Sequence, residues 1–582
     1  MTASAGLKDV AAALQLRARR DLSDFAGGQR VYRAATLSGQ TVTGFAVEPV
    51  DLRQGDKGVG AALLSGRFGL AGETLQIEAG ESLWDRPSPS RRFAEALHGF
   101  DWLRDLLSVD DPEALSRARA HFDDWISHFG RWNWFAWSPE VTGRRLSALA
   151  YAGPRLFEDE TGAPVSARYG VVARGARRLA RTAPLLAETR DRLDAAIALS
   201  LANTVFDLGD TAFKQANEAL SVALKRQVLP DGGHVSRSPE AGAELFVDLA
   251  ALEDAARRRG LQLHFECRRA LDRLAPMARF FQLPGGALAS FHGGGEGDAQ
   301  ALKAAARLVD APNKSFDIAP HAGFHRIDAG GSVVIMDTGA PPAHAHARDA
   351  HASALAFEFA ASGSRLVVNC GWSSDQPNHW RDAVRATAAH SALTLEETSS
   401  ARLLKPGWRR DLLGPRISEG PEPVRARRNE EELGAWLEAT HDGYRQSYGL
   451  GVRRRLFLAA DGGDLRGEDG LYRPVEDGPP ANPEARLQFA LRFHLHPGVR
   501  ASLSRDSLSA LLVLPNGDGW RFRTDGGPVR LERSVYLSAG APPQRSTQLV
   551  VAGEAETFGA GDRPPNRVRW AFQRLGRVGA AG

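Results

Sequence analysis

The sequence has only two cysteines among its 582 residues, Cys267 and Cys370, and they stand far apart. Two distant cysteines exclude a disulfide framework, and we expect both to be buried thiols. No apolar run approaches the roughly 20 residues of a membrane span. An excess of one charge is also missing, because 73 Lys and Arg against 70 Asp and Glu leave a formal net charge of +3. So small an excess gives no argument for a nucleic-acid partner or an anionic membrane.

The N-terminal segment, MTASAGLKDVAAALQLRARRDL, lacks the apolar core of an export signal, because Lys8 and Asp9 stand where that core belongs. The segment is typical of an amphipathic helix. Taken alone, the sequence therefore predicts a cytoplasmic protein.

The length is enough for at least two large domains with separate cores. Hydrophobic residues make up 43% and charged residues 25%, as in an ordinary globular protein. Residues 1–89 hold the N-terminal helix and then short alternating runs, which predict a small hairpin in GRFGLAGETLQIEAG.

From residue 90 to about residue 282, apolar residues recur every three or four positions, the period of a helix with one buried face. Helices of this length with short polar connections predict a helical bundle, solenoid or toroid. The apolar stripes lie at residues 93–107, 115–129, 193–205, 213–228 and 245–252.

After about residue 312 the pattern changes to short runs rich in β-branched and aromatic residues, separated by Gly, Pro, Asp and Asn. In LAFEFA, Leu355, Phe357 and Phe359 alternate with small or polar residues, as in a half-buried strand. We expect an all-β half, an antiparallel sandwich of stacked sheets. The predicted domains are 1–89, 90–311 and 312–582, with a junction rich in Gly and Ala at 282–312.

The stretch 349–395 carries the most specific pattern, DAHASALAFEFAASGSRLVVNCG followed by WRDAVRATAAHSALTLEE. A His-rich start, an L-S-F-E-L-like strand, a glycine turn, a second strand, W-R and an R-x-T-x-A-H segment follow in fixed order. This order resembles the second half of the heparinase II/III polysaccharide lyases. The match covers about fifty residues and keeps several of the spacings.

A second resemblance lies in the helical half, where LPDGGHVSRSP is similar to that family's D-G-S-F-x-E-R-S-P loop between toroid helices. The coinciding residues are Asp231, Gly232, Arg237, Ser238 and Pro239. The resemblance implies an incomplete (α/α) toroid followed by an antiparallel β-sandwich. It also implies β-elimination on an acidic, uronate-containing polysaccharide, which would be both substrate and partner.

Such a reaction needs a group that neutralises the uronate carboxylate, a base for the neighbouring proton and an acid for the leaving oxygen. In the family, a Tyr after the S-P of the toroid loop and a His opening an H-x-H-x-D segment transfer protons. Those positions hold Ala241, followed by Gly242, and Asp349, with Ser353 in place of the Asp. Ala187 lies near the position of the carboxylate-gripping Asn or His. Alanine transfers no proton, so the standard catalytic residues are missing.

Other polar residues stand near these positions. His234 is the candidate proton-transfer group, because imidazole titrates near neutrality, and Arg237 is the candidate for gripping a uronate or sulfate. Asp349, as a partner for a histidine, completes the predicted catalytic set. The alternative is that His234 and Arg237 stabilise a loop and that His344 and His346 are exposed. The candidate substrate contacts outside this set are His344, His346 and Arg381.

The family's metal site takes a His, an Asp and a His from three sheet segments. The matching positions hold His351, Asn369 and His390, so the resemblance implies one zinc ion as a cofactor. A neutral amide is a poor zinc ligand, and the alternative is a histidine pair bonded inside the sheet core.

The run WNWFAW places Trp132, Trp134 and Trp137 just before a predicted helix. Aromatic faces stack on sugar rings, which makes these residues candidate substrate contacts. The alternative is that so dense a cluster belongs to the core.

Three hypotheses follow for the function. The first is a polysaccharide lyase with a rearranged site around His234 and Arg237, and the second is a non-catalytic carbohydrate-binding or assembly protein on the same scaffold. The third is hydrolysis or epimerisation in the same cleft, and hydrolysis needs a pair of carboxylates. Family resemblance favours the cell envelope over the cytoplasm, and the sequence gives no indication of the oligomeric state.

Overall fold

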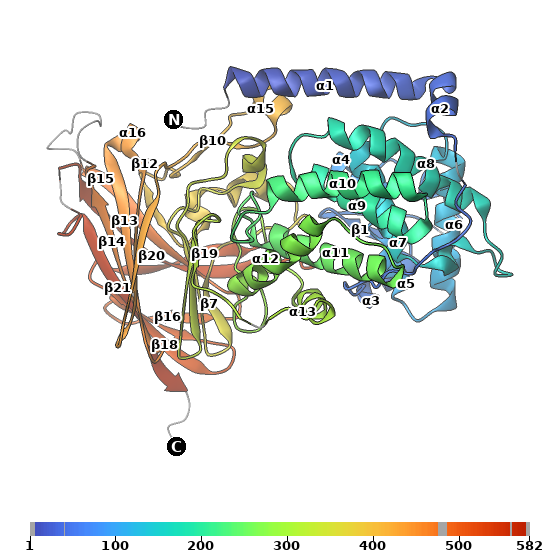
Figure 1. Ribbon diagram of the computed structural model, residues 1–582. Coiled ribbons are helices and arrows are strands. Elements are labelled where there is room, and N and C mark those ends of the chain that lie inside the picture. The colour runs from blue at the N-terminus through green and yellow to red at the C-terminus, as the bar shows by residue number, and fades with distance from the viewer. Residues whose placement is uncertain are drawn as a thin grey trace.

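Helices fill the first half of the chain and strands the second in the computed structural model (Figure 1), which describes residues 6–577 apart from 40, 79, 313, 475–485 and 559–560. This order confirms the predicted fold class, a helical toroid followed by antiparallel sheets. Cys267 and Cys370 are both buried and free, as predicted. Among the described helices, none combines the length and the apolar character that crossing a membrane requires.

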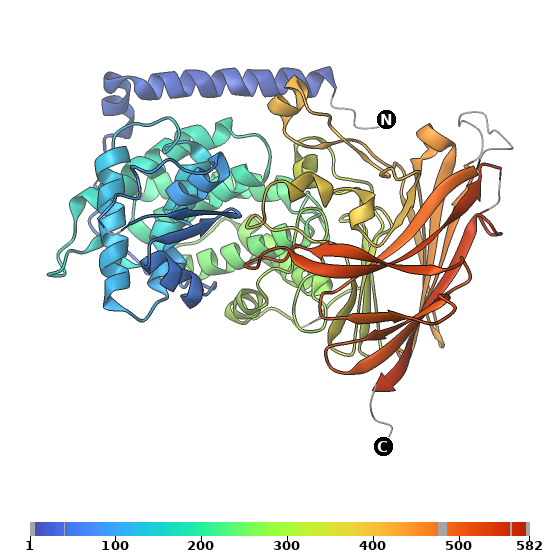
Figure 2. The ribbon, with the colours of Figure 1, turned by 180° about the vertical axis from the view of Figure 1, so that it is seen from behind.

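The N-terminal region begins with a long helix that lies along one side of the molecule in both views (Figures 1 and 2). This helix, α1 (Leu7–Gly28), runs from α2 (Arg30–Leu37) toward α15 (Trp408–Leu413) in the sheet half. It is fastened by ion pairs from Arg20 to Glu140 and from Asp24 to Arg178, each at 2.7 Å. The predicted hairpin follows after α3 (Lys57–Leu64), as β1 (Arg67–Leu70) and β2 (Glu73–Gln76).

The toroid is built from helices whose ends carry ordinary start signals. Ser90 caps the first of them by accepting a hydrogen bond from Phe93 N, and Pro112 follows the capping Asp111 in another. The helices are α4 (Arg91–Gly99), α5 (Leu103–Leu107), α6 (Pro112–Phe129), α7 (Pro139–Tyr151), α8 (Ser166–Thr182), α9 (Arg190–Phe206), α10 (Asp210–Gln227), α11 (Pro239–Arg258), α12 (Phe265–Phe281) and α13 (Ala299–Leu308).

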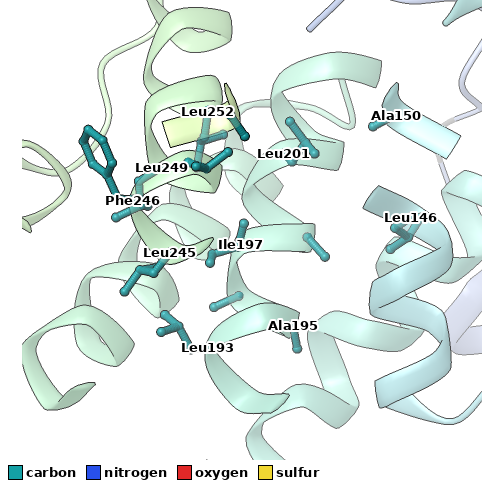
Figure 3. Packing of buried hydrophobic residues seen from close by; sticks show 14 of the residues in the cluster. Leu146, Ala150, Leu193, Ala195, Ile197, Leu201, Leu245, Phe246, Leu249 and Leu252 are labelled. Atoms are coloured by element: carbon teal, nitrogen blue, oxygen red, sulfur yellow. The ribbon is translucent and has the colours of Figure 1, made fainter. Parts of the chain in front are cut away.

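Helix α9 lies at the centre of the helical core, because it is buried on nearly every side from Leu193 to Phe206. Figure 3 shows its side chains packed between α7 and α11. Burying a Leu or Ile side chain contributes about 1.5–3 kcal/mol, so this layer fixes the relative positions of the three helices. The first turns of these same helices carry the charged residues described below.

The sheet half consists of two antiparallel sheets stacked on a shared core. The strands of the outer sheet are, in spatial order, β11 (Arg425–Glu431), β12 (Gly434–Tyr444), β13 (Leu450–Ala459), β14 (Asp464–Tyr472), β21 (Arg567–Arg577), β18 (Asp518–Thr524), β17 (Ser509–Val513) and β16 (Arg500–Leu503). The sheet nearer the toroid has the order β19 (Val529–Tyr536), β20 (Gln544–Glu556), β15 (Arg486–Leu495), β7 (Ser364–Val368), β6 (Phe357–Ala361), β5 (Ser332–Asp337), β4 (Phe324–Ala329) and β3 (Ile318–Ala319), with β8 (Leu393–Leu395) paired to β15.

The segments that approach the toroid are connections between these strands. The 3₁₀ turn His344–Asp349 joins β5 to β6, and α14 (Trp380–Ala383) and the turn Thr387–Ala389 lie between β7 and β8. The remaining short elements are β9 (Arg402–Leu403), β10 (Ile417–Glu419) and α16 (Arg445–Tyr448).

Candidate functional site

The loop between α10 and α11 carries the motif DGGHVSRSP and lies against the sheet half. A bridge between Val228 and His234 closes the loop. Gly232 has φ +91, and a Cβ there would lie 2.0 Å from Arg273 O, so only glycine fits. Ser238 caps α11 by accepting a hydrogen bond from Ala241 N, and Pro239 follows it. The motif therefore encodes a rigid turn that starts a helix.

Arg237 is buried, and its guanidinium donates hydrogen bonds to the sheet half. Nε donates to Ala322 O at 2.7 Å, Nη1 to Ala340 O at 2.8 Å and Nη2 to Gly323 O at 2.9 Å. Nη2 also forms an ion pair with Asp337, which is fully buried. With these bonds in place, Arg237 offers no free fork to a uronate. These contacts fit the alternative that the sequence left open, an arginine that stabilises a loop, and the substrate grip stays a prediction.

Asp337 collects the polar groups around Arg237 into one buried network. His292 Nε2 lies 3.1 Å from its carboxylate, and Ser353 Oγ donates to it at 2.7 Å. Burial alone would raise the pKa of Asp337, but Arg237 and His292 hold it well below its usual range. Asp337 therefore stays ionised and is the anchor for the loop before α11, the segment between α12 and α13 that carries His292, and the segment before β6 that carries Ser353.

His234 is also buried, and both of its ring nitrogens are occupied. Nδ1 lies 2.7 Å from Ser236 Oγ, and Nε2 lies 3.1 Å from Gln227 Oε1. Desolvation, with smaller effects from Arg190 and His346, holds the pKa of His234 well below its ordinary value. Both nitrogens of this imidazole are thus engaged, as in the alternative that the sequence left open, and a role for His234 as the general base stays a prediction.

The other predicted catalytic and binding residues lie on the connections of the sheet half. Asp349 accepts a hydrogen bond from Arg381 at 2.5 Å, so the structure brings these two predicted residues together. The partner of Asp349 is therefore an arginine and not the expected histidine. His344 is exposed and lies 3.2 Å from Asp9 of α1. His346 is half-buried, and desolvation lowers its pKa.

The predicted metal ligands lie together in the sheet core. His351 Nδ1 lies 3.0 Å from His390 Nε2. Asn369 Nδ2 donates to Ser290 O at 3.0 Å, while its Oδ1 accepts from Ser391 N at 3.2 Å. In the part of the chain that the structure describes, no group of three His, Cys, Asp or Glu side chains is arranged to hold a metal ion. Two imidazoles and an engaged amide do not fit the donor set of zinc.

The three tryptophans have different positions. Trp137 is 2% exposed, and its Nε1 donates to Phe129 O at 2.7 Å. Trp132 is half-buried, with the Arg178 guanidinium 4.5 Å from its ring, and Trp134 is 65% exposed. Trp137 thus belongs to the core, whereas parts of the other two rings reach solvent.

A cavity of about 630 Å³, here called the toroid cavity, opens beside Ala241. Arg190 connects the two, because it lines the cavity and its Nη1 donates to Ala241 O at 2.7 Å. The charged residues of the lining are seven carboxylates and four guanidinium groups, namely Asp51, Asp101, Glu140, Asp191, Asp194, Glu244, Asp248, Arg53, Arg104, Arg144 and Arg190. With every group ionised the lining carries a net charge of −3, the difference between seven and four.

Burial raises the pKa of three carboxyl groups in and near the cavity lining. Desolvation raises the pKa of Asp101 and Asp194 to about 6, against the opposing charges of Arg144 and Arg190. Desolvation, together with the charge of Glu244, raises the pKa of Glu240 to about 8. Glu240 accepts a hydrogen bond from Gly295 N at 2.8 Å, so it lies where the toroid meets the junction segment. These carboxyl groups hold protons close to neutral pH.

Sequence reasoning missed the toroid cavity. Its signal was present, because the lining residues Glu244 and Asp248 stand four residues apart on one helix, and Arg190 and Asp194 have the same spacing on another. Charged residues at helical spacing on an otherwise apolar helix mark one polar face. The apolar stripes predict only the buried faces of these helices, which lie opposite the charged residues.

Comparison with known proteins gives this architecture a family. Residues 311–571 match the family model described as "Heparinase II/III-like, C-terminal". A relative from Caulobacter vibrioides (strain NA1000 / CB15N), FtsZ-localized protein C, is 39% identical over 536 residues, which cover 91% of this chain and 90% of that protein. The chain belongs to the heparinase II/III-like family.

Solved structures show the same fold across nearly the whole chain. Heparinase III aligns with a TM-score of 0.63 at 14% identity, over 99% of this chain and 93% of that one. A mutant of heparan sulfate lyase HepC from Pedobacter heparinus aligns with a TM-score of 0.56 at 14% identity, over 98% and 91%. The toroid and sandwich of this heparinase II/III-like chain are therefore those of the lyases, while its residues at the implied catalytic positions differ.

Breaking the buried pair tests its structural role. Arg237→Ala leaves the Asp337 charge without its main partner, so we expect the free energy of unfolding to fall by about 3–5 kcal/mol. Denaturant unfolding measures the loss. Arg381→Ala removes a more exposed ion pair and is the matched control, with an expected loss of about 0–1 kcal/mol. Equal losses in the two variants would contradict the role given to Arg237.

The raised pKa of Glu240 predicts a pH dependence. Its folded pKa of about 8 exceeds its ordinary value of 4.5, so between these pH values the native state binds more protons than the unfolded state. Stability then falls as pH rises from 4.5 to 8. Glu240→Gln should raise the Tm more at pH 8 than at pH 5, as thermal melts will measure. The exposed Glu113→Gln is the control, and an equal change at both pH values would exclude the shift.

The zinc expectation is settled by elemental analysis. Given the donor set around His351 and His390, we expect purified protein to contain far less than one equivalent of zinc, and chelation to leave its Tm unchanged. About one equivalent per chain, lost in His351→Ala, would instead establish the zinc site that the resemblance implied.

Proposed function

We propose that this chain is a catalytically degenerate heparinase II/III-like protein, which binds or assembles other molecules at the sites where FtsZ gathers. The observation that carries the proposal is the state of the loop at residues 229–239. Ala241 replaces the implied tyrosine, Arg237 is committed to Asp337, and His234 is enclosed between two side chains. None of the three supplies proton transfer to a polymer.

The charge of the toroid cavity supports the same proposal. An acidic polysaccharide would bring carboxylates or sulfates to a lining whose net charge is −3 with every group ionised, and −1 (five carboxylates against four guanidinium groups) when Asp101 and Asp194 are protonated. Like charges repel in both states, and lining arginines already pair with carboxylates: Arg53 lies 2.5 Å from Asp248, and Arg190 lies 2.5 Å from Asp194. The charge of the toroid cavity therefore gives no support to an acidic polysaccharide as its ligand.

The relative's name supports the cellular setting. FtsZ-localized protein C matches 91% of this chain at 39% identity, so both halves of the molecule are shared. We extend its localisation with FtsZ to this chain as part of the proposal. The predicted cell-envelope location rests on family resemblance and stays a prediction.

A lyase with a rearranged site is the second candidate, and Glu240 is the observation that favours it. A carboxyl group with a pKa of about 8 is protonated at neutral pH and suits a general acid. It lies one residue before Ala241, whose carbonyl accepts a hydrogen bond from Arg190 in the lining of the toroid cavity. In this version Glu240 takes the role that the sequence assigned to His234.

Imaging tests the first proposal. A fluorescent fusion of the full chain should overlap with FtsZ in dividing cells and lose its position when FtsZ is depleted. A diffuse signal beside normal FtsZ assemblies would contradict it. Free fluorescent protein, expressed at the same level, is the control.

A lyase assay separates the two candidates. Purified protein is incubated with a panel of uronate polymers, and the ultraviolet absorbance of unsaturated ends is followed, with heparan sulfate lyase HepC on heparan sulfate as the positive control. We expect no product. Activity that falls about 10²–10⁴-fold in Glu240→Gln, but not in His234→Ala, would establish the rearranged lyase instead.

A further inference from the structure

A second cavity lies on the toroid between α2, α8 and the segment that follows α6. Its volume is about 1010 Å³, and it shares no lining residue with the toroid cavity. We call it the arginine cavity, because its described lining contains five arginines and no Asp or Glu. The five are Arg30, Arg33, Arg131, Arg174 and Arg177.

The two cavities of the toroid thus have opposite charge. Five guanidinium groups give the lining of the arginine cavity a charge of +5, against −3 for the toroid cavity with every group ionised. Elsewhere in the described structure arginines pair with carboxylates, as Arg53 does with Asp248 and Arg365 with Glu358. Gathering five arginines without a lining acid costs repulsion, which an anionic ligand would relieve.

Several of these arginines are held in place by the backbone. Arg33 Nη1 donates to Gly27 O at 2.9 Å and to Gly28 O at 2.7 Å, at the end of α1. Arg177 Nη1 donates to Leu37 O at 2.9 Å, at the end of α2. The Arg33 bonds tie α2 to α1, the Arg177 bond ties α8 to α2, and together they present the two side chains to the cavity at fixed positions.

Arg174 has a buried hydrogen-bond donor without an acceptor in the part of the chain that the structure describes. Its Nε is buried and has no hydrogen-bond partner among the described residues. Desolvation, and then the charge of Arg177, lowers the pKa of Arg174. Gly170, one turn earlier on α8, leaves room for its guanidinium, since a Cβ there would lie 3.0 Å from Nη1. An oxyanion in the cavity would provide the charge that this side chain lacks.

Two of the predicted sugar contacts line this cavity. Trp132 presents part of its indole ring, while Trp137 is enclosed and forms part of the wall. An indole edge beside guanidinium groups suits a ligand that carries its anionic groups on a compact carbon framework. The arrangement differs from a bare phosphate site, in which backbone N–H groups predominate.

We propose that the arginine cavity binds a small polyanion, a ligand with two or more phosphate, sulfate or carboxylate groups. The volume is that of a large small-molecule site and has room for a ligand of nucleotide or disaccharide size. Recognition rests on bidentate guanidinium–oxyanion bonds, and Arg174 makes the most buried of them. This inference is independent of the proposed function, because it uses none of the residues at the toroid cavity.

Titration calorimetry on the full chain at low salt tests the proposal. The probes are inorganic pyrophosphate and a sulfated heparin disaccharide, with neutral maltotriose as the control ligand. Arg174→Gln should raise the Kd roughly 10- to 100-fold through the loss of one charge-assisted bond, and the exposed Arg30→Gln should raise it less. Stronger binding of pyrophosphate or of the disaccharide identifies which source of oxyanions the cavity accepts.

Two further variants serve as controls for this binding experiment. Arg181→Gln changes an exposed arginine on α8 that does not line the cavity, and Arg144→Gln changes one in the toroid cavity. Both should leave the Kd unchanged. The proposal is overturned if neither polyanion binds, if maltotriose binds equally well, or if Arg174→Gln and Arg30→Gln both bind as tightly as the unaltered protein. None of these outcomes bears on localisation with FtsZ.

Discussion

The bond between Arg237 and Asp337 is the constraint on which the joint between toroid and sandwich depends. It joins the loop before α11 to the end of β5 inside the protein, where neither charge can be left alone. Arg237 adopts a left-handed conformation with φ +61, a strain that its contacts must offset. The ion pair therefore fixes the position of the loop, and with it the positions of the other loop residues.

Holding the loop in this way engages the two side chains that were its candidates for chemistry, Arg237 and His234. A side chain that grips a substrate must keep donors free, and a general base must exchange protons with its surroundings. Arg237 donates hydrogen bonds to backbone carbonyls of the sheet half, and His234 is hydrogen-bonded to Gln227 and Ser236. A motif shared with lyases thus acts in this chain as the structural connection between two domains.

The sequence was informative wherever local periodicity decides the structure. The stripe at 193–205 became α9, and the alternation around Phe357 became β6, because burial of one face follows directly from spacing. The partners of Arg237 lie 85 to 103 residues away, so no spacing near it reveals that it is a buried joint. The family pattern brought His351 and His390 together correctly, since it encodes tertiary contacts. It said nothing of Arg174, which lies outside its motifs.

The toroid carries two cavities whose linings have opposite charge, which separates anion binding from the position implied for catalysis. A lyase cleft must attract its acidic polymer at the place where protons are exchanged, so charge and catalysis coincide. Here carboxylates line the cavity that Arg190 connects to Ala241, and five arginines line a separate cavity around Trp132. The two cavities share no lining residue, so an anion bound among the arginines would not depend on chemistry beside Ala241. A binding protein can then carry its positive site wherever helices such as α2 and α8 meet.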